Sequence, residues 1–216
     1  MRAMKDSGVE WIGKIPKAWT ICRIKNVANV LRGGSPRPIE EYLTDEPDGL
    51  NWIKIGDTEK GEKYITHTSQ KISSRGLSKT RLVHSGDLLL TNSMSFGEPY
   101  ILGIEGCIHD GWVCFTNVHS ISQEYLYYVL CSDLCKTQFR LQVAGGVVQN
   151  LNIDKIGATF VVLPPLTEQT AIAAYLDDKC SKIDNNIRLR EALIAKLLDY
   201  KKSLIYETVT GKKETV

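Results

Sequence analysis

The sequence predicts an α+β protein in which a mixed, mostly β domain is followed by one long helix. Short apolar runs separated by Gly, Pro, Asp and Ser fill residues 21–118, which is typical of strands and turns. An apolar repeat with steps of three and four residues runs through the last part of the chain. With 216 residues, the chain accommodates one domain of roughly 160 residues and this helix, but no second full domain.

The first part of the chain is expected to consist mainly of strands. Its apolar or alternating runs end at residues that favour turns. These runs occupy residues 52–56, 63–72, 88–93 and 99–104. Because the runs are short and closely spaced, we expect several short strands and not one extended sheet of long strands.

A helix and a last strand are expected to complete this domain. Apolar residues recur at helical spacing over 123–142, and Ser122 is a suitable cap for that helix. A short turn is predicted at 153–156, and the β-branched segment 158–163 is predicted to be a strand. The domain as a whole is predicted to cover residues 1–165.

The long helix has a recognisable start. Pro164 and Pro165 keep the residues before them extended. Thr167 can cap the helix, and Glu168 places negative charge in the first turn, where the helix dipole favours it. The helix is therefore expected to begin near Thr167.

A continuous apolar seam follows along this helix, which is predicted over 166–210 with a tail at 211–216. The seam has the a/d register of a coiled coil, and only Arg190 and Lys201 interrupt its apolar character. Its members are Ala173, Leu176, Cys180, Ile183, Ile187, Arg190, Ile194, Leu197, Lys201 and Leu204. About 40 residues at about 1.5 Å each give a rod of about 60 Å, which is longer than one domain needs to cover its core. We therefore expect the seam to pack against another long helix.

Charge is unevenly distributed, although Lys plus Arg exceed Asp plus Glu by only two (27 minus 25). This small excess argues against a nonspecific nucleic-acid binder. Acidic residues gather in one stretch: Glu40, Glu41, Asp45, Glu46 and Asp48. Basic residues dominate the next stretch: Lys54, Lys60, Lys63, Lys71, Arg75, Lys79 and Arg81. The basic stretch is a candidate for phosphate binding, and the alternative is an ordinary solvated face.

The six cysteines, at positions 22, 107, 114, 131, 135 and 180, show no CxxC spacing. No signal peptide precedes them, so the sequence predicts neither a disulfide framework nor a metal site. We expect reduced, mostly buried thiols in a cytoplasmic protein. No apolar run approaches the length of a membrane span, so no membrane association is expected.

The catalytic motifs of adenine methyltransferases, nucleases and ATP-binding enzymes are missing from the sequence. Leu163 precedes the diproline where an adenine methyltransferase needs Asn or Asp, and leucine accepts no hydrogen bond. Gly33 and Gly34 are followed by Ser-Pro and not by a helical pattern that would cradle a cofactor. Residues 57–63 lack the (D/E)-x-K spacing of a nuclease, and no ATP-binding loop is found. The four histidines are scattered, so we expect no catalysis and no cofactor.

Five blocks of residues, in this order along nearly the whole chain, resemble one known family. The blocks are Ser7-Gly8-Val9-Glu10-Trp11-Ile12-Gly13 with Ile15-Pro16 and Trp19; Gly33-Gly34-Ser35-Pro36; Trp52-Ile53-Lys54-Ile55-Gly56-Asp57; Gly86-Asp87-Leu88-Leu89-Leu90; and the helical stretch from Leu163 to Gly211. Together they resemble the specificity subunits of type I restriction-modification systems, the HsdS family.

The resemblance implies a DNA sequence-specificity subunit that reads one half-site of double-stranded DNA per chain. Its implied partners are adenine methyltransferase subunits and, optionally, an ATP-dependent restriction subunit. The family usually carries two recognition domains and two helical regions, whereas this chain has one of each. That departure implies either a half-size subunit that pairs or a fragment of a longer protein.

Antiparallel pairing of two such chains would give a homodimer that reads an interrupted palindrome. The residues expected to hold the dimer are Leu176, Ile183, Ile187, Ile194, Leu197 and Leu204. The resemblance suggests a spacer of about 6 to 8 base pairs, which covers about 20 to 27 Å at 3.4 Å per step. The helix would then set the gap between the half-sites.

For DNA contact, the sequence suggests the basic stretch and the polar loop that follows Gly86–Leu90. The candidates are Lys54, Lys71, Arg75, Lys79, Arg81, Asn92, Ser93 and Ser95. A second polar cluster comprises Gln138, Arg140, Gln142, Gln149 and Asn150, around Gly145-Gly146. The rival hypothesis is a coiled-coil adaptor whose basic stretch binds an acidic protein partner.

Overall fold

The computed structural model describes residues 2–59, 61–93, 97–143 and 151–214. The chain forms two compact units, Met1–Ala173 and Ala174–Val216. The first unit contains the strands and short helices, together with the first turns of the long helix. The second unit is the remainder of that helix and its tail. This mixed α+β architecture with a long C-terminal helix confirms the predicted fold class.

The first sheet of unit 1 has five strands and lies at its centre. Its order is β4 (Asn29–Arg32), β13 (Trp112–Thr116), β10 (Leu88–Thr91), β11 (Pro99–Leu102) and β7 (Tyr64–Ile65). Neighbours are antiparallel except β11 and β7, which are parallel. All four residues of β10 are buried, because both faces of this strand are covered. That burial explains why its sequence is a continuous apolar run and not an alternating one.

The second sheet also has five strands and includes two residues of the basic stretch, Lys71 and Arg81. Its order is β5 (Leu43–Thr44), β8 (Lys71–Ile72), β6 (Leu50–Ile53), β12 (Gly106–Ile108) and β9 (Arg81–Val83). β12 and β6 are parallel, and the other pairs are antiparallel. The prediction of a single strand over 63–72 is therefore wrong. One end of this segment forms β7 in the first sheet, and the other end forms β8 in the second sheet.

Two small antiparallel pairs complete the β structure. β1 (Met4–Asp6) pairs with β2 (Lys14–Pro16), and β3 (Thr20–Arg23) pairs with β14 (Phe160–Leu163). Four 3-10 helices connect strands: η1 (Ile24–Asn26), η2 (Ile39–Glu41), η3 (Ile55–Asp57) and η4 (Ser74–Lys79). The predicted last strand is thus confirmed as β14, although it begins two residues later than expected.

The predicted single helix over 123–142 is two helices. α1 (Gln123–Cys131) is capped by the Ser122 side chain, as expected, and α2 (Asp133–Val143) follows it. Ser132 between them has extended backbone angles, so the helix breaks although the apolar spacing continues. The turn predicted at 153–156 is a short helix, α3 (Ile153–Ala158).

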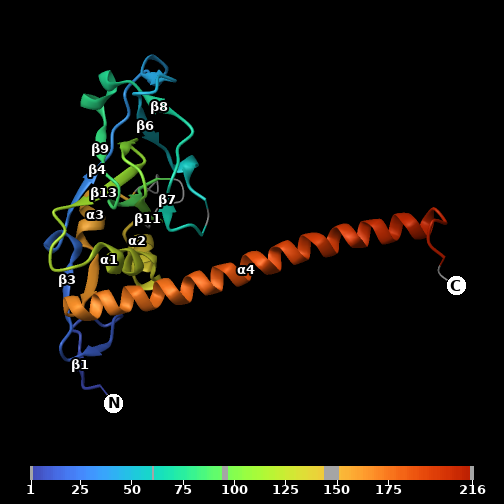
Figure 1. Cartoon of the computed structure of the whole chain (residues 1–216). Helices are drawn as coiled ribbons and strands as arrows, with labels where there is room; N and C mark the ends of the chain where they lie inside the picture. Colours follow the sequence, from blue (N-terminus) through green and yellow to red (C-terminus); the bar gives the residue numbers. More distant parts are fainter. Residues whose placement is uncertain (1, 60, 94–96, 144–150, 215–216) are drawn as a thin grey trace. The chain divides into compact units, whose positions relative to one another are not determined.

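Three apolar clusters show how the layers pack. The first joins one face of the first sheet, including Leu88, Leu90 and Phe115, to α1, α2 and α3. The second fills the space between the two sheets, with Leu89 facing residues such as Ile108. Figure 1 shows the strands β6, β8 and β9 of the second sheet at one end of this unit and the three short helices at the other. The first sheet is therefore buried on both sides.

The long helix, α4 (Leu166–Val209), is tied to unit 1 by its first turns. Gln169 is fully buried, donates to the carbonyl oxygens of Ser120 and Pro164, and accepts from the Ser122 amide at 2.8 Å. Glu168 accepts from the Trp19 indole at 2.9 Å. The helix begins at Leu166, so Thr167 lies inside the first turn and is not the cap that we predicted.

The rest of α4 forms unit 2 and is exposed. Every residue from 181 to 203 is exposed, including Ile183 at 57% and Ile194 at 56%. The 44 residues of α4 span about 66 Å at about 1.5 Å each, and Gly211, with φ 71°, follows the helix end. The apolar side chains of the seam from Ile183 to Leu197 are thus exposed in this single chain.

Candidate nucleic-acid interface

The structure brings the five predicted basic residues to one sheet. Lys71 lies in β8 and Arg81 in β9, while Lys54 directly follows β6. Arg75 and Lys79 lie in η4, which leads into β9. Residues that are up to 27 positions apart in sequence therefore belong to the second sheet or its immediate connections.

Two of these cations gather at the ring of Tyr42. The Lys79 ammonium lies 4.8 Å from the ring centroid and donates to the Tyr42 hydroxyl. The Arg75 guanidinium lies 6.0 Å from the same centroid and donates to the Glu41 carbonyl oxygen at 2.9 Å. Both side chains are exposed, so they remain accessible to an anionic ligand.

The other three basic residues are half-buried and are held by neutral oxygen atoms. Lys54 Nζ donates to Gln70 Oε1 at 2.7 Å, and Lys71 Nζ donates to the Pro47 carbonyl oxygen at 3.2 Å. Arg81 Nε donates to the Arg32 carbonyl oxygen at 2.9 Å. Since each cation has further N–H donors, these bonds orient the side chains without exhausting their capacity.

The predicted polar loop after β10 has a different character. Asn92 is only 2% exposed, and its side-chain Nδ2 donates to the Asp110 carbonyl oxygen at 3.2 Å. Its backbone N–H donates to the Gly111 carbonyl oxygen, so Asn92 connects two segments of the domain. Ser93 is half-buried, and Ser95 lies outside the described residues.

The second polar cluster is largely structural. Gln138 is buried and forms two hydrogen bonds with the backbone of Phe160, accepting at 2.8 Å and donating at 2.9 Å. Gln142 donates to the Thr159 hydroxyl at 3.1 Å, whereas Arg140 is exposed. Gln138 therefore joins α2 to β14. The members Gln149 and Asn150 and the pair Gly145-Gly146 lie outside the described residues.

The segment Gly33–Pro38, which we call the glycine loop, passes between two other backbones. A Cβ on Gly33 would lie 2.2 Å from the His109 carbonyl oxygen. A Cβ on Gly34 would lie 2.6 Å from the Lys79 carbonyl oxygen. Because both neighbours are backbone atoms, only glycine permits this approach. The paired glycines therefore place Ser35, Pro36 and Arg37 beside the turn that joins β12 to β13.

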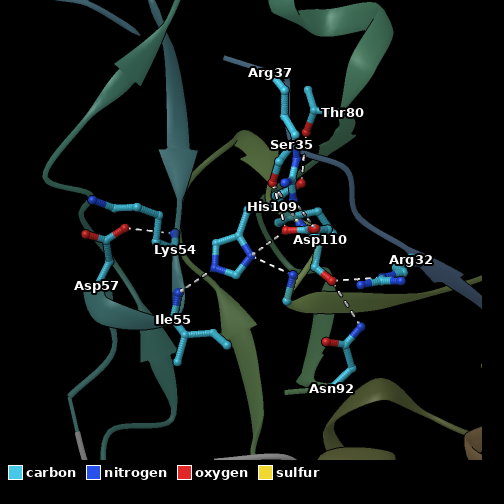
Figure 2. A network of polar contacts seen from close by, with 12 residues as sticks. Arg32, Ser35, Arg37, Lys54, Ile55, Asp57, Thr80, Asn92, His109 and Asp110 are labelled. Atoms are coloured by element: carbon cyan, nitrogen blue, oxygen red, sulfur yellow. Dashed lines mark hydrogen bonds and ion pairs between the residues drawn. The ribbon is translucent and has the colours of Figure 1, made fainter. Parts of the chain in front are cut away.

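Asp110, in that turn, is the centre of a polar network (Figure 2). Its carboxylate accepts from the Ser35 hydroxyl at 2.8 Å and from Arg37 Nη2 at 3.2 Å. Its carbonyl oxygen accepts from Arg32 Nε at 2.8 Å and from Asn92. Burial alone would raise the pKa of Asp110, but the Ser35 hydroxyl and the nearby Arg32 and Arg37 charges lower it below its ordinary value. Asp110 therefore remains ionised.

His109 lies beside Asp110 with both ring nitrogens facing backbone amides. The Ile55 amide is 3.1 Å from Nε2, and the Gly111 amide is 2.6 Å from Nδ1. A neutral ring can accept from one of these amides and a charged ring from neither, so the surroundings favour the neutral form. Consistently, burial lowers the pKa of His109, although the Asp110 and Asp57 carboxylates oppose this shift. His109 is a structural residue of the turn.

A cavity of about 540 Å³ opens next to this network. Its walls combine apolar residues with cations and backbone, and include Pro36, Arg37, Pro38, Trp52, Lys54 and His109. Sequence reasoning missed Arg32 and Arg37, because each stands alone beside the glycine pair and not in the basic stretch. Their position on either side of Gly33-Gly34 was the signal that could have identified them.

Within residues 2–59, 61–93, 97–143 and 151–214, three or more His, Cys, Asp or Glu side chains nowhere group as they would around a metal ion. Over the same ranges, no helix combines the length and apolar character needed to cross a bilayer. Burial raises the pKa of Cys107 and Cys114 to about 11, so these thiols are protonated core residues.

A mixed α+β unit with cations on one sheet, continued by a long exposed helix, defines a recognisable class of protein. The family model described as "Type I restriction modification DNA specificity domain" matches residues 16–198. Since this match covers most of the chain, the chain belongs to that family.

Curated relatives agree with this assignment at low identity. The chain is 25% identical over 186 residues to the type I restriction enzyme MjaIX specificity subunit of Methanocaldococcus jannaschii, covering 84% of this chain and 42% of the relative. It is 22% identical over 210 residues to the EcoKI specificity subunit of Escherichia coli K12, covering 93% and 44%. The chain therefore spans less than half the length of these relatives.

Solved structures share the fold. The HsdS subunit from Thermoanaerobacter tengcongensis superposes with a TM-score of 0.62 at 21% identity, covering 84% of this chain and 42% of the other. A chain from a structure concerning complex assembly and conformational transition of the type I R-M system gives 0.74 at 20% identity, covering 94% and 48%. At these identities the likeness is one of fold.

Proposed function

We propose that this chain is a non-catalytic DNA sequence-specificity subunit, with one recognition domain (1–165), one helical spacer (166–210) and a short tail (211–216). In this proposal it reads one half-site of a bipartite target in the cytoplasm and recruits adenine methyltransferase subunits and an ATP-dependent restriction subunit. The observation that carries the proposal is the exposed apolar seam of α4 in a chain that matches the DNA specificity family. Such a seam requires a partner helix.

The proposed DNA surface is formed by the cations of the second sheet and of its connections. Arg75 and Lys79 at Tyr42, with Lys54, Lys71 and Arg81, would bind phosphate oxygens and fix the register of the domain on the duplex. Ser93, which is half-buried in the segment after β10, stays a candidate for DNA contact. Asn92, being buried, would position the Asp110 turn and not touch DNA.

The proposed dimer uses the seam of α4 in an antiparallel arrangement. Its core would comprise Leu176, Ile183, Ile187, Ile194, Leu197 and Leu204. Antiparallel a/d pairing about the middle of the seam places Ile183 opposite Ile194 of the second copy, and Cys180 opposite Leu197. The two recognition domains would then face opposite ends of an interrupted palindrome, each reading the same half-site.

Apolar residues beside the seam support the recruitment of a further helical partner. Leu193 and Tyr200 lie at positions on one side of the a/d seam, and Leu198 and Ile205 on the other. These side chains are 53–60% exposed. A two-stranded coiled coil covers mainly the a and d positions, so this wider apolar face suits additional helices. We assign it to the methyltransferase subunit.

The second candidate function is a coiled-coil adaptor whose basic sheet binds an acidic protein. The exposed Arg75 and Lys79 at Tyr42 would also suit an acidic protein surface, whereas the family match favours DNA. The two functions differ in whether DNA modification depends on the chain.

The experiment is to map N6-methyladenine in DNA from cells that contain the partner methyltransferase with and without this chain. We expect methylation at an interrupted palindrome only when both are present. Purified chain alone, incubated with DNA, S-adenosylmethionine, magnesium and ATP, should leave the DNA unmodified and uncut. Methylation that is identical without the chain, or activity of the chain alone, would contradict the proposal.

A further inference from the structure

We infer that Arg37 is a base-reading residue that contacts a guanine in the major groove, and that Asp110 is the positioning residue that holds it. This inference rests on the proposed function. Arg37 lies in the glycine loop, at the rim of the 540 Å³ cavity. Its side chain is 79% exposed, so the guanidinium is available to a ligand.

The first argument is that Asp110 orients the Arg37 side chain. Its Nη2 donates to Asp110 Oδ2 at 3.2 Å, and Asp110 cannot easily follow a movement of the arginine. Ser35 holds the other carboxylate oxygen at 2.8 Å, while Arg32 and Asn92 hold the carbonyl oxygen. Figure 2 shows these contacts converging on Asp110 from separate segments. A side chain held this way loses less conformational freedom on binding.

The second argument concerns the donors that remain. A guanidinium has five N–H donors in a planar fork, and the Asp110 contact occupies only one edge of it. Two parallel donors from such a fork match the O6 and N7 acceptors of guanine in the major groove. The Arg37 side chain therefore has both the free donors and the fixed geometry that a bidentate base contact needs.

The third argument separates base reading from phosphate binding. A carboxylate 3.2 Å from the guanidinium nearly cancels its charge and repels phosphate oxygens. Lys54 and Lys79, by contrast, donate to neutral oxygen atoms of Gln70 and Tyr42 and keep their full charge. A phosphate contact would therefore favour those residues, whereas Arg37 contributes through its geometry.

The test is a selection of bound duplexes from a pool with randomised base pairs, using the full-length chain with its methyltransferase subunits. The variants are Arg37→Ala, Arg37→Lys and Asp110→Asn, with Lys79→Ala as the matched phosphate-contact control. Arg37→Lys keeps the charge but loses the planar fork. The unfolding midpoint of each variant is measured beside the selection, and the exposed Arg37 variants should match the wild type.

We expect Arg37→Ala and Arg37→Lys to lose guanine preference at one position of each half-site by about 10-fold to 100-fold, with the other positions unchanged. Asp110→Asn should weaken the preference at that same position. Lys79→Ala should lower affinity for all sequences equally and reduce the logarithmic salt slope by about one.

Either of two results would overturn this inference and leave the proposed function intact. The first is an unchanged base profile in Arg37→Ala, and the second is a uniform loss of affinity that Arg37→Lys restores. If the wild-type complex selects no sequence at all, the proposed function fails, and this inference falls with it.

Discussion

Where one backbone passes within contact distance of another, a side chain has no room, and Gly33 occupies such a position. A Cβ there would collide with the carbonyl oxygens of His109 and Ile108, at 2.2 and 2.7 Å. These carbonyl groups belong to β12 and the turn after it, so they cannot move without disturbing both sheets. The glycine is thus a requirement of the loop that carries Arg37.

We predict that Gly33→Ala lowers the free energy of unfolding by roughly 1–3 kcal/mol, because added volume in a packed site forces the backbone to shift. Gly56 is the matched control, since it lines the same cavity but its added Cβ would meet nothing within 4 Å. Gly56→Ala should stay within about 0.5 kcal/mol of the wild type. Urea unfolding with a common slope measures both, and equal midpoints would refute the close-approach argument.

Several residues of the five blocks that resemble the HsdS family have local structural roles. Asp57 accepts from the Lys54 and Ser69 amides and thereby closes the η3 turn. Gly86, with φ 94°, allows the turn before the buried strand β10, and Gln169 anchors α4. Turns, caps and buried runs leave clear traces in a sequence, so these parts of the fold were predictable. The Asp110 network was not, because its members come from three separate segments, 32–37, 92 and 110.

At the scale of elements, predictions succeeded where the local pattern decided the structure and failed where tertiary contacts did. The limits of α4 were predicted to within about one residue. The pairing of β7 and β8 with different sheets, and the break at Ser132, follow from packing between distant segments. The long helix remains the element whose function is least explained by the rest of the chain.

We predict that the double change Ile187→Asp with Ile194→Asp converts a dimer into monomers. Both side chains are about half exposed in the single chain, and pairing would bury two new charges per copy at a cost of several kcal/mol. Sedimentation velocity on the full-length chain measures the change.

The matched control places the same two charges on the opposite face of α4. Leu189 and Ala195 lie outside the a/d seam, and both are exposed. Leu189→Asp with Ala195→Asp should leave the dimer intact. If the seam variant stays dimeric, or if both variants dissociate equally, the interface does not follow the seam.

At the scale of the whole molecule, two properties of the proposed DNA target depend on two different parts of the chain. The first unit would determine which bases are read, and the length of α4 would determine how far apart the two half-sites lie. The two properties should therefore change independently. A change in the helix should leave the half-site bases alone, and a change at Arg37 should leave the spacer alone.

We predict that four residues inserted after Ile187 alter the preferred spacer by one or two base pairs, or abolish binding through rotation about the DNA axis. The insertion lengthens the helix by about 6 Å and nearly preserves the seam, while each base-pair step is about 3.4 Å. Methylation mapping gives the spacer and the half-sites together. Four residues inserted after Gly211, beyond the helix, are the control and should change neither. Full activity of the first variant on the original spacer would show that α4 does not measure distance.

The burial of the first sheet on both faces affects how the sequence of such a protein can evolve. Its two apolar clusters stabilise the domain independently of the outer side of the second sheet, where the third cluster holds three buried residues, Trp52, Ile72 and Cys107. Exposed side chains above this small cluster can be exchanged at little cost in stability. If the chain reads DNA as proposed, new target preferences would therefore arise by a few surface substitutions on an unchanged scaffold, while the helix would continue to fit the same partners.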